Sequence, residues 1–111
     1  MIRHLVHLRF SDDVAADQKL ALFAGLAGLR QHLTGITDFQ NRPNISPETP
    51  VVHGFADMFW FDFTDAAARD AYLADPDHQA IGARLVAAVG GPEGILVCDI
   101  DLSPGPEGQE P

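Results

Sequence analysis

The chain has 111 residues, the length of one domain, and 46% of them are hydrophobic, which is enough for a core. Its formal net charge of −9 repels nucleic-acid phosphates and anionic lipid headgroups, which argues against nucleic acid and membranes as partners. Cys98 is the single cysteine, which excludes an intramolecular disulfide and a cysteine-rich zinc site and favours a cytoplasmic address.

The N-terminal segment from Ile2 to Phe10 is predicted to be the first strand. Its alternate residues form a more apolar set, which indicates one buried face. That set is Ile2, His4, Val6, Leu8 and Phe10. Basic residues interrupt the segment, and this pattern favours a strand over a signal peptide or a membrane span.

Leucines and Phe23 at helical spacing predict a helix from about Ala15 to Leu33, which Gly35 ends. Residues 11–13, Ser-Asp-Asp, offer capping oxygens just before it. A second strand is expected from Ile36 to Arg42. The three prolines that follow are expected to exclude regular structure, so residues 44–53 are predicted to form a loop.

The segment from Gly54 to Phe63 is predicted to be a third strand that is apolar on both faces and covered on both. One face carries Phe55, Asp57, Phe59, Phe61 and Phe63, and the other carries Ala56, Met58 and Trp60.

Two helical segments and a last strand complete the chain. Thr64 and Asp65 cap a short helix that runs through Tyr72, and Asp75-Pro76 begins a second helical segment that ends at Gly90-Gly91. The last strand is expected from about Ile95 to Leu102. Residues 1–102 are therefore expected to form one domain, and residues 103–111, rich in Pro, Gly and Glu, a flexible acidic tail.

The order βαββαβ predicts an α+β fold of ferredoxin-like topology, with a four-stranded antiparallel sheet and helices on one face. The other face is left bare. Surplus apolar surface predicts that two copies press these faces together as a homodimer, a dimeric α/β barrel with an apolar cavity. The predicted interface carries Phe55, Phe59 and Phe61.

Tyr72 and His78 are the candidate catalytic residues. With Asp75 as cap, His78 is the third residue of its helix, where the positive end of the helix dipole lowers the pKa of the imidazole. A histidine that is neutral near pH 7 suits a general base. The structural alternative is that His78 helps to cap the helix while Tyr72 packs with its hydroxyl at the surface.

His4, Val6, Asp57 and Phe59 are the candidate ligand-binding residues. His4 places a polar group on an apolar strand face, and its alternative role is a core histidine bonded to a backbone carbonyl. The carboxylate of Asp57 is costly on the apolar strand face unless it is paired or hydrated, and His4 is a possible partner for it. A metal site of His4, Asp57 and His78 can be drawn, but no ligand spacing demands it, and the prediction includes neither metal nor cofactor.

Four stretches and Asp99 make the sequence, from Arg3 to about Leu102, resemble the stress-responsive A/B barrel (Dabb) family. They are Arg-His-Leu-Val-His-Leu-Arg-Phe at residues 3–10, Asn-Ile-Ser-Pro at 44–47, Gly54-Phe55, and Ala-Tyr-Leu-Ala-Asp-Pro-Asp-His at 71–78. The resemblance implies a homodimer. A plant polyketide cyclase of this family uses a Tyr and a His that match Tyr72 and His78. At Asp57, where many relatives carry histidine, this chain departs from the family.

Three functions follow as hypotheses. The first is a dimeric protein that binds a small apolar or aromatic molecule in the barrel cavity. The second is a polyketide-cyclase-like enzyme in which His78 removes a proton next to a carbonyl and Tyr72 donates a hydrogen bond to the enolate oxygen. The third is a cofactor-free oxygenase that uses the same cavity.

Overall fold

The computed structural model describes residues 1–103, so residues 104–111 of the predicted tail lie outside the described residues. The sheet is antiparallel and has four strands in the order β2-β3-β1-β4. Its strands are β1 (Ile2–Leu8), β2 (Ile36–Pro43), β3 (Asp57–Phe63) and β4 (Ile95–Asp101). The helices are α1 (Ala16–Gly28), α2 (Thr49–Val52), α3 (Ala66–Ala74) and α4 (Pro76–Ala88).

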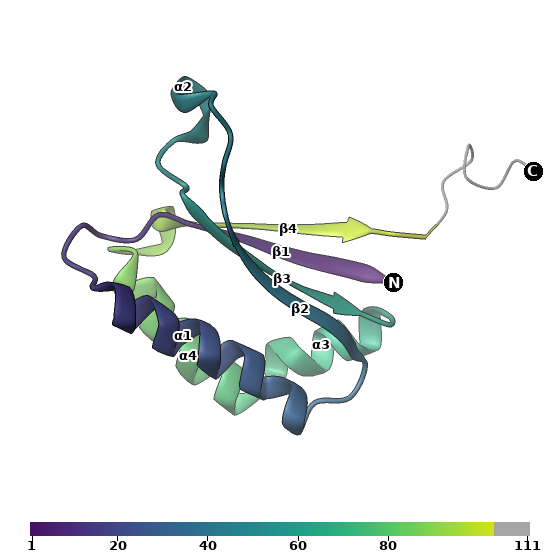
Figure 1. Cartoon of the computed structure of the whole chain (residues 1–111). Coiled ribbons are helices and arrows are strands. Elements are labelled where there is room, and N and C mark those ends of the chain that lie inside the picture. Colours follow the sequence, from purple (N-terminus) through teal and green to yellow (C-terminus); the bar gives the residue numbers. More distant parts are fainter. Residues whose placement is uncertain (104–111) are drawn as a thin grey trace, which may run out of the picture.

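Three helices cover one face of the sheet. Figure 1 shows α1, α3 and α4 on the same side, while α2 projects away from them on the connection between β2 and β3. This order and these layers are those of the predicted ferredoxin-like fold, which is confirmed. Within residues 1–103, each helix is too short or too polar to cross a membrane.

The core lies between the sheet and these helices. Buried side chains alternate along β1, as the apolar pattern of this strand predicts. The core comprises Val6 and Leu8 of β1, Phe59, Phe61 and Phe63 of β3, Leu22, Phe23 and Leu26 of α1, Leu29 of the 3₁₀ turn that follows it, and Tyr72, Leu85 and Val89.

The prediction that Phe59 and Phe61 lie at a dimer interface is wrong. The antiparallel register pairs Val6 with Phe59 and His4 with Phe61, so both rings point to the helix-covered face. Phe55 precedes β3, and Arg9 lies over its ring. The open sheet face instead carries an apolar patch of Leu5, Met58, Trp60, Leu96, Cys98 and Ile100.

The first helix is shorter than predicted and has a different cap. It ends at Gly28, and a 3₁₀ turn, Leu29–Gln31, follows it. Its N-cap position is Ala15, and the side-chain oxygen of Gln18 accepts a hydrogen bond from the Ala15 N–H at 2.7 Å. Residues 11–13 therefore do not cap it, because Val14 and Ala15 separate them from the first turn.

The predicted loop between β2 and β3 contains the one-turn helix α2. Pro50 does not prevent it, because Pro50 lies in the first turn, where a backbone N–H has no partner within the helix. The third strand begins at Asp57 rather than Gly54, because residues 53–56 form the turn and connection that lead from α2 into β3.

Gly35, which precedes β2, should tolerate no side chain. Its φ is +83°, and a Cβ there would lie 2.6 Å from the Cβ of Ala68. We expect Gly35→Ala to lower the free energy of unfolding by at least about 1–2 kcal/mol in urea denaturation, because strain and overlap add.

Gly28→Ala is the matched control. Gly28 has φ −66° and an added Cβ would meet nothing within 4 Å, so alanine should stabilise the protein by about 0.4–1 kcal/mol. Equal effects of the two substitutions would contradict this interpretation.

Candidate functional site

The junction of α3 and α4 positions Tyr72 and His78. Asp75 ends α3 and caps α4, and its Oδ2 accepts a hydrogen bond from the His78 N–H at 2.9 Å, which confirms the predicted cap. Pro76 is the first residue of α4. This sharp junction folds the first turn of α4 back on α3, so that the ring centroids of Tyr72 and His78 lie 3.9 Å apart.

Tyr72 is a core residue with 1% of its surface exposed. Its ring centroid lies 4.8 Å from that of Phe61 and 5.5 Å from that of His4. Its buried Oη has no hydrogen-bond partner in residues 1–103, contrary to the alternative in which the hydroxyl reaches the surface. Burial raises the pKa of Tyr72, so the phenol keeps its proton at neutral pH.

His78 is half-buried, and its Nδ1 is a second buried polar atom without a partner in the described part of the chain. The pKa of His78 is lowered, first because burial disfavours the imidazolium and next because of the electrostatic effect of neighbouring His4, while Asp75 opposes the shift. The direction agrees with the sequence prediction, but burial rather than the helix dipole is the main cause. His78 is therefore neutral at pH 7.

His4 is tied to β4. Its Nδ1 lies 2.6 Å from Oδ1 of Asp99, and Arg69 Nη1 donates to Oδ2 of the same carboxylate at 3.0 Å. Burial alone would raise the pKa of Asp99, but the hydrogen bonds from His4 and Arg69 hold it below its ordinary value. Asp99, not Asp57, is thus the partner of His4.

The strand registers explain this partnership. His4 pairs with Asp99 across β1 and β4, whereas Asp57 pairs with Leu8 at the other end of β1. Asp57 instead has its Oδ2 3.8 Å from Lys19 Nζ. Sequence reasoning missed Arg69 and gave Asp99 no role, since only the register of β4 against β1 brings them to His4.

The six predicted site residues therefore fall into three groups. His4, Tyr72 and His78 come together as one group, here called the His-Tyr-His cluster. Val6 and Phe59 are neighbours in the core, one step along the strands from the cluster. Asp57 lies apart from the cluster.

One group in residues 1–103 has the spacing of metal ligands. His32 Nε2 lies 3.0 Å from Asp75 Oδ1 and 3.6 Å from Asp77 Oδ2. Asp75 already caps α4, and hydrogen bonds from the His78 N–H and from His32 keep its pKa low. These contacts are explained by a hydrogen bond between His32 and Asp75 that supports the cap.

The largest hollow beside the cluster has a volume of about 450 Å³ and is lined by Arg69 and Asp99 among others. Neither Tyr72 nor His78 lines it, nor do they line two other hollows of about 390 and 220 Å³. Within the His-Tyr-His cluster, His4 and Tyr72 are buried, and His78, at the start of α4, is the most exposed member.

Comparisons with known proteins agree with this fold. The model of the stress responsive A/B barrel domain, Dabb, matches residues 2–101. A dimeric ferredoxin-like protein of unknown function from Jannaschia sp. CCS1 is 38% identical, with 91% of this chain and 98% of that chain covered and a TM-score of 0.82. A Dabb family protein from Mesorhizobium loti is 26% identical, with coverage of 92% and 97% and a TM-score of 0.70.

A more distant likeness concerns the fold alone. Hydroxynitrile lyase from Passiflora edulis is 17% identical, with 92% of this chain and 94% of that chain covered and a TM-score of 0.77. The search of curated proteins found no match.

Proposed function

This chain belongs to the stress-responsive A/B barrel family, and we propose that it is a homodimer that binds a small apolar carbonyl compound at the His-Tyr-His cluster and moves a proton on it. Two buried polar atoms support this proposal above all. Tyr72 Oη and His78 Nδ1 have no partner in residues 1–103, and an unpaired buried polar group costs about 1–3 kcal/mol. A ligand oxygen and an acidic proton would give them partners.

The chemistry follows from the protonation states of the two groups. Neutral His78 accepts a proton from the carbon next to the carbonyl, so the C–H bond breaks and an N–H bond forms. Tyr72, whose raised pKa keeps it protonated, donates a hydrogen bond to the carbonyl oxygen on which negative charge develops. Return of the proton restores both groups.

The surroundings of the cluster favour an apolar or aromatic ligand. Phe61 and Phe63 pack against Tyr72 with ring centroids 4.8 and 5.2 Å away. Both rings are fully buried, so the groups around the Tyr72 hydroxyl are mainly apolar, and a compound that enters beside half-exposed His78 to reach this hydroxyl would find few hydrogen-bond partners there.

The open sheet face supports the homodimer. Leu96 and Ile100 of its apolar patch are 48% and 41% exposed, and α1, α3 and α4 all lie on the other face of the sheet (Figure 1). The similar protein from Jannaschia is described as dimeric. A second copy would remove the patch from water.

Hydrogen exchange on acetophenone, an apolar aromatic ketone, tests the proposal. In D₂O the protein should accelerate the loss of the methyl signal in ¹H NMR relative to buffer, and His53→Asn, which changes a histidine in the α2 to β3 turn, should behave as the wild type. Binding shifts without faster exchange would leave a binding protein and overturn the proton transfer. If the protein shows neither binding shifts nor faster exchange, the proposal as a whole is overturned.

A further inference from the structure

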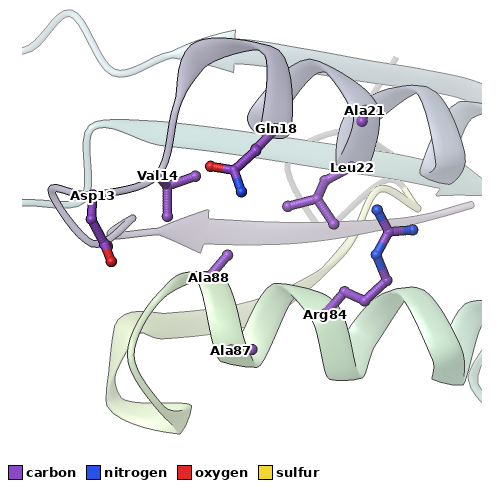
Figure 2. Close-up of a pocket in the computed structure, with 8 residues that line it drawn as sticks. All are labelled: Asp13, Val14, Gln18, Ala21, Leu22, Arg84, Ala87 and Ala88. Atoms are coloured by element: carbon purple, nitrogen blue, oxygen red, sulfur yellow. The ribbon is translucent and has the colours of Figure 1, made fainter.

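A hollow of about 390 Å³ lies between the start of α1 and the last turns of α4, at the end of α4 opposite to the junction at Pro76 (Figure 2). It is bounded by the loop before α1, by the first turns of α1 and by the last turns of α4. Its lining comprises Asp13, Val14, Gln18, Ala21, Leu22, Arg84, Ala87 and Ala88.

Small side chains open this hollow. Toward the C-terminal end of α1, the two helices approach closely at Gly25, where a Cβ would lie 3.3 Å from Ile81 Cδ1. Nearer the start of α1, the residues that face each other include Ala21, Ala87 and Ala88, whose small side chains leave space between the helices. The buried side chain of Leu22 gives the hollow an apolar floor.

Arg84 is exceptional among the seven lysines and arginines, all of which lie in the described residues. It alone has no hydrogen bond, ion pair or contact with an aromatic ring in the part of the chain that the structure describes. The other six have such partners: Arg3, Arg9, Lys19, Arg30, Arg42 and Arg69. Its side chain extends from α4 toward α1 along one edge of the hollow (Figure 2).

Gln18 supplies a second donor. Its Oε1 accepts the Ala15 N–H, so the amide NH₂ is the end that points into the hollow (Figure 2). The last carbonyls of α4 do not compete for these donors. Ala87 O and Ala88 O accept hydrogen bonds from the N–H groups of Gly90 and Ser11.

We propose that this hollow binds a small carboxylate that carries a short apolar chain. The guanidinium of Arg84 holds the carboxylate with two parallel hydrogen bonds, and the Gln18 amide donates a third. The apolar chain lies over Leu22 and Val14, at a site of a size that small ligands use. Asp13 lines the opposite end, which excludes a second negative charge there (Figure 2). This site is independent of the proposed proton transfer.

Titration of the ¹⁵N-labelled protein with sodium hexanoate tests the site. Saturable amide shifts should appear at Leu22, Ala88 and their neighbours, while hexanamide, which is neutral, should bind at least about tenfold more weakly. Added salt should weaken hexanoate binding but not hexanamide binding.

Variants make the test specific to Arg84. Arg84→Met should weaken hexanoate binding at least about tenfold. The affinity of Arg84→Lys should lie between those of the wild type and Arg84→Met, because lysine keeps the positive charge but cannot donate two parallel hydrogen bonds as the guanidinium does. Arg30→Met, in the 3₁₀ turn that follows α1, is the control and should bind as the wild type. Equal affinity in Arg84→Met, shifts centred on Tyr72 and His78, or no saturable binding would each overturn the proposal.

Discussion

The variant Phe59→Asp should be unfolded. Phe59 is 2% exposed, and its ring lies among those of Phe23, Phe39 and Phe61. Loss of the ring costs about 3–5 kcal/mol, and burying an unpaired carboxylate costs several more, which together match the whole stability of a typical domain, about 5–15 kcal/mol. Far-UV circular dichroism should show loss of helix.

The next residue of the same strand is the matched control for this variant. Trp60 points to the open sheet face, where Arg3 lies over its ring. Trp60→Asp should keep the helical spectrum but lower the mass in light scattering from about twice 12.0 kDa to 12.0 kDa. A folded Phe59→Asp, or a Trp60→Asp that remains dimeric, would contradict the assignment of the two strand faces.

The second large effect is expected for His78→Ala, which should reduce the exchange of acetophenone by about 10²–10⁴-fold, the usual contribution of a general base. The fold should persist, because His78 is half-buried and its backbone N–H keeps the cap with Asp75. The NMR exchange assay and a thermal melt measure the two effects separately.

Tyr72→Phe should separate function from stability. It removes a hydroxyl whose oxygen has no partner in residues 1–103, so the ligand-free protein should be as stable as the wild type or more stable. Exchange should nevertheless slow, because the enolate oxygen loses its donor. A large loss of stability in Tyr72→Phe would indicate that the hydroxyl has a structural role. Wild-type exchange rates in both Tyr72→Phe and His78→Ala would indicate the same for the pair.

Local sequence signals were sufficient for the topology and for the α3 to α4 junction. Asp75-Pro76 defines a cap and a first turn within a few residues, and this places His78 in the first turn of α4. That its ring lies against Tyr72 follows from the angle between α3 and α4, which the sequence pattern does not give. The alternation in β1 likewise indicates the buried face that carries His4. These features depend on neighbours along the chain.

The sequence predictions fail where contacts between residues far apart in the chain determine the structure. Because β3 is apolar on both faces, its pattern does not tell which face the helices cover, and the register with β1 settles that Phe59 and Phe61 face inward. The partner of His4 depends in the same way on β4, whose register places Asp99 opposite it. Asp57, four residues along β3 from Phe61, is too far away for that role.

The protonation of His78 tests the central claim most directly, since only a neutral imidazole can act as the base at pH 7. A ¹H–¹⁵N NMR titration of the histidine ring signals, assigned with His78→Ala, measures its midpoint. The account predicts a midpoint below the ordinary value of 6.5, with the unprotonated ring dominant at pH 7. A midpoint at or above 6.5 would contradict the lowered pKa, and a midpoint above 7 would show that the imidazolium dominates at pH 7 and would contradict the role of His78 as the base.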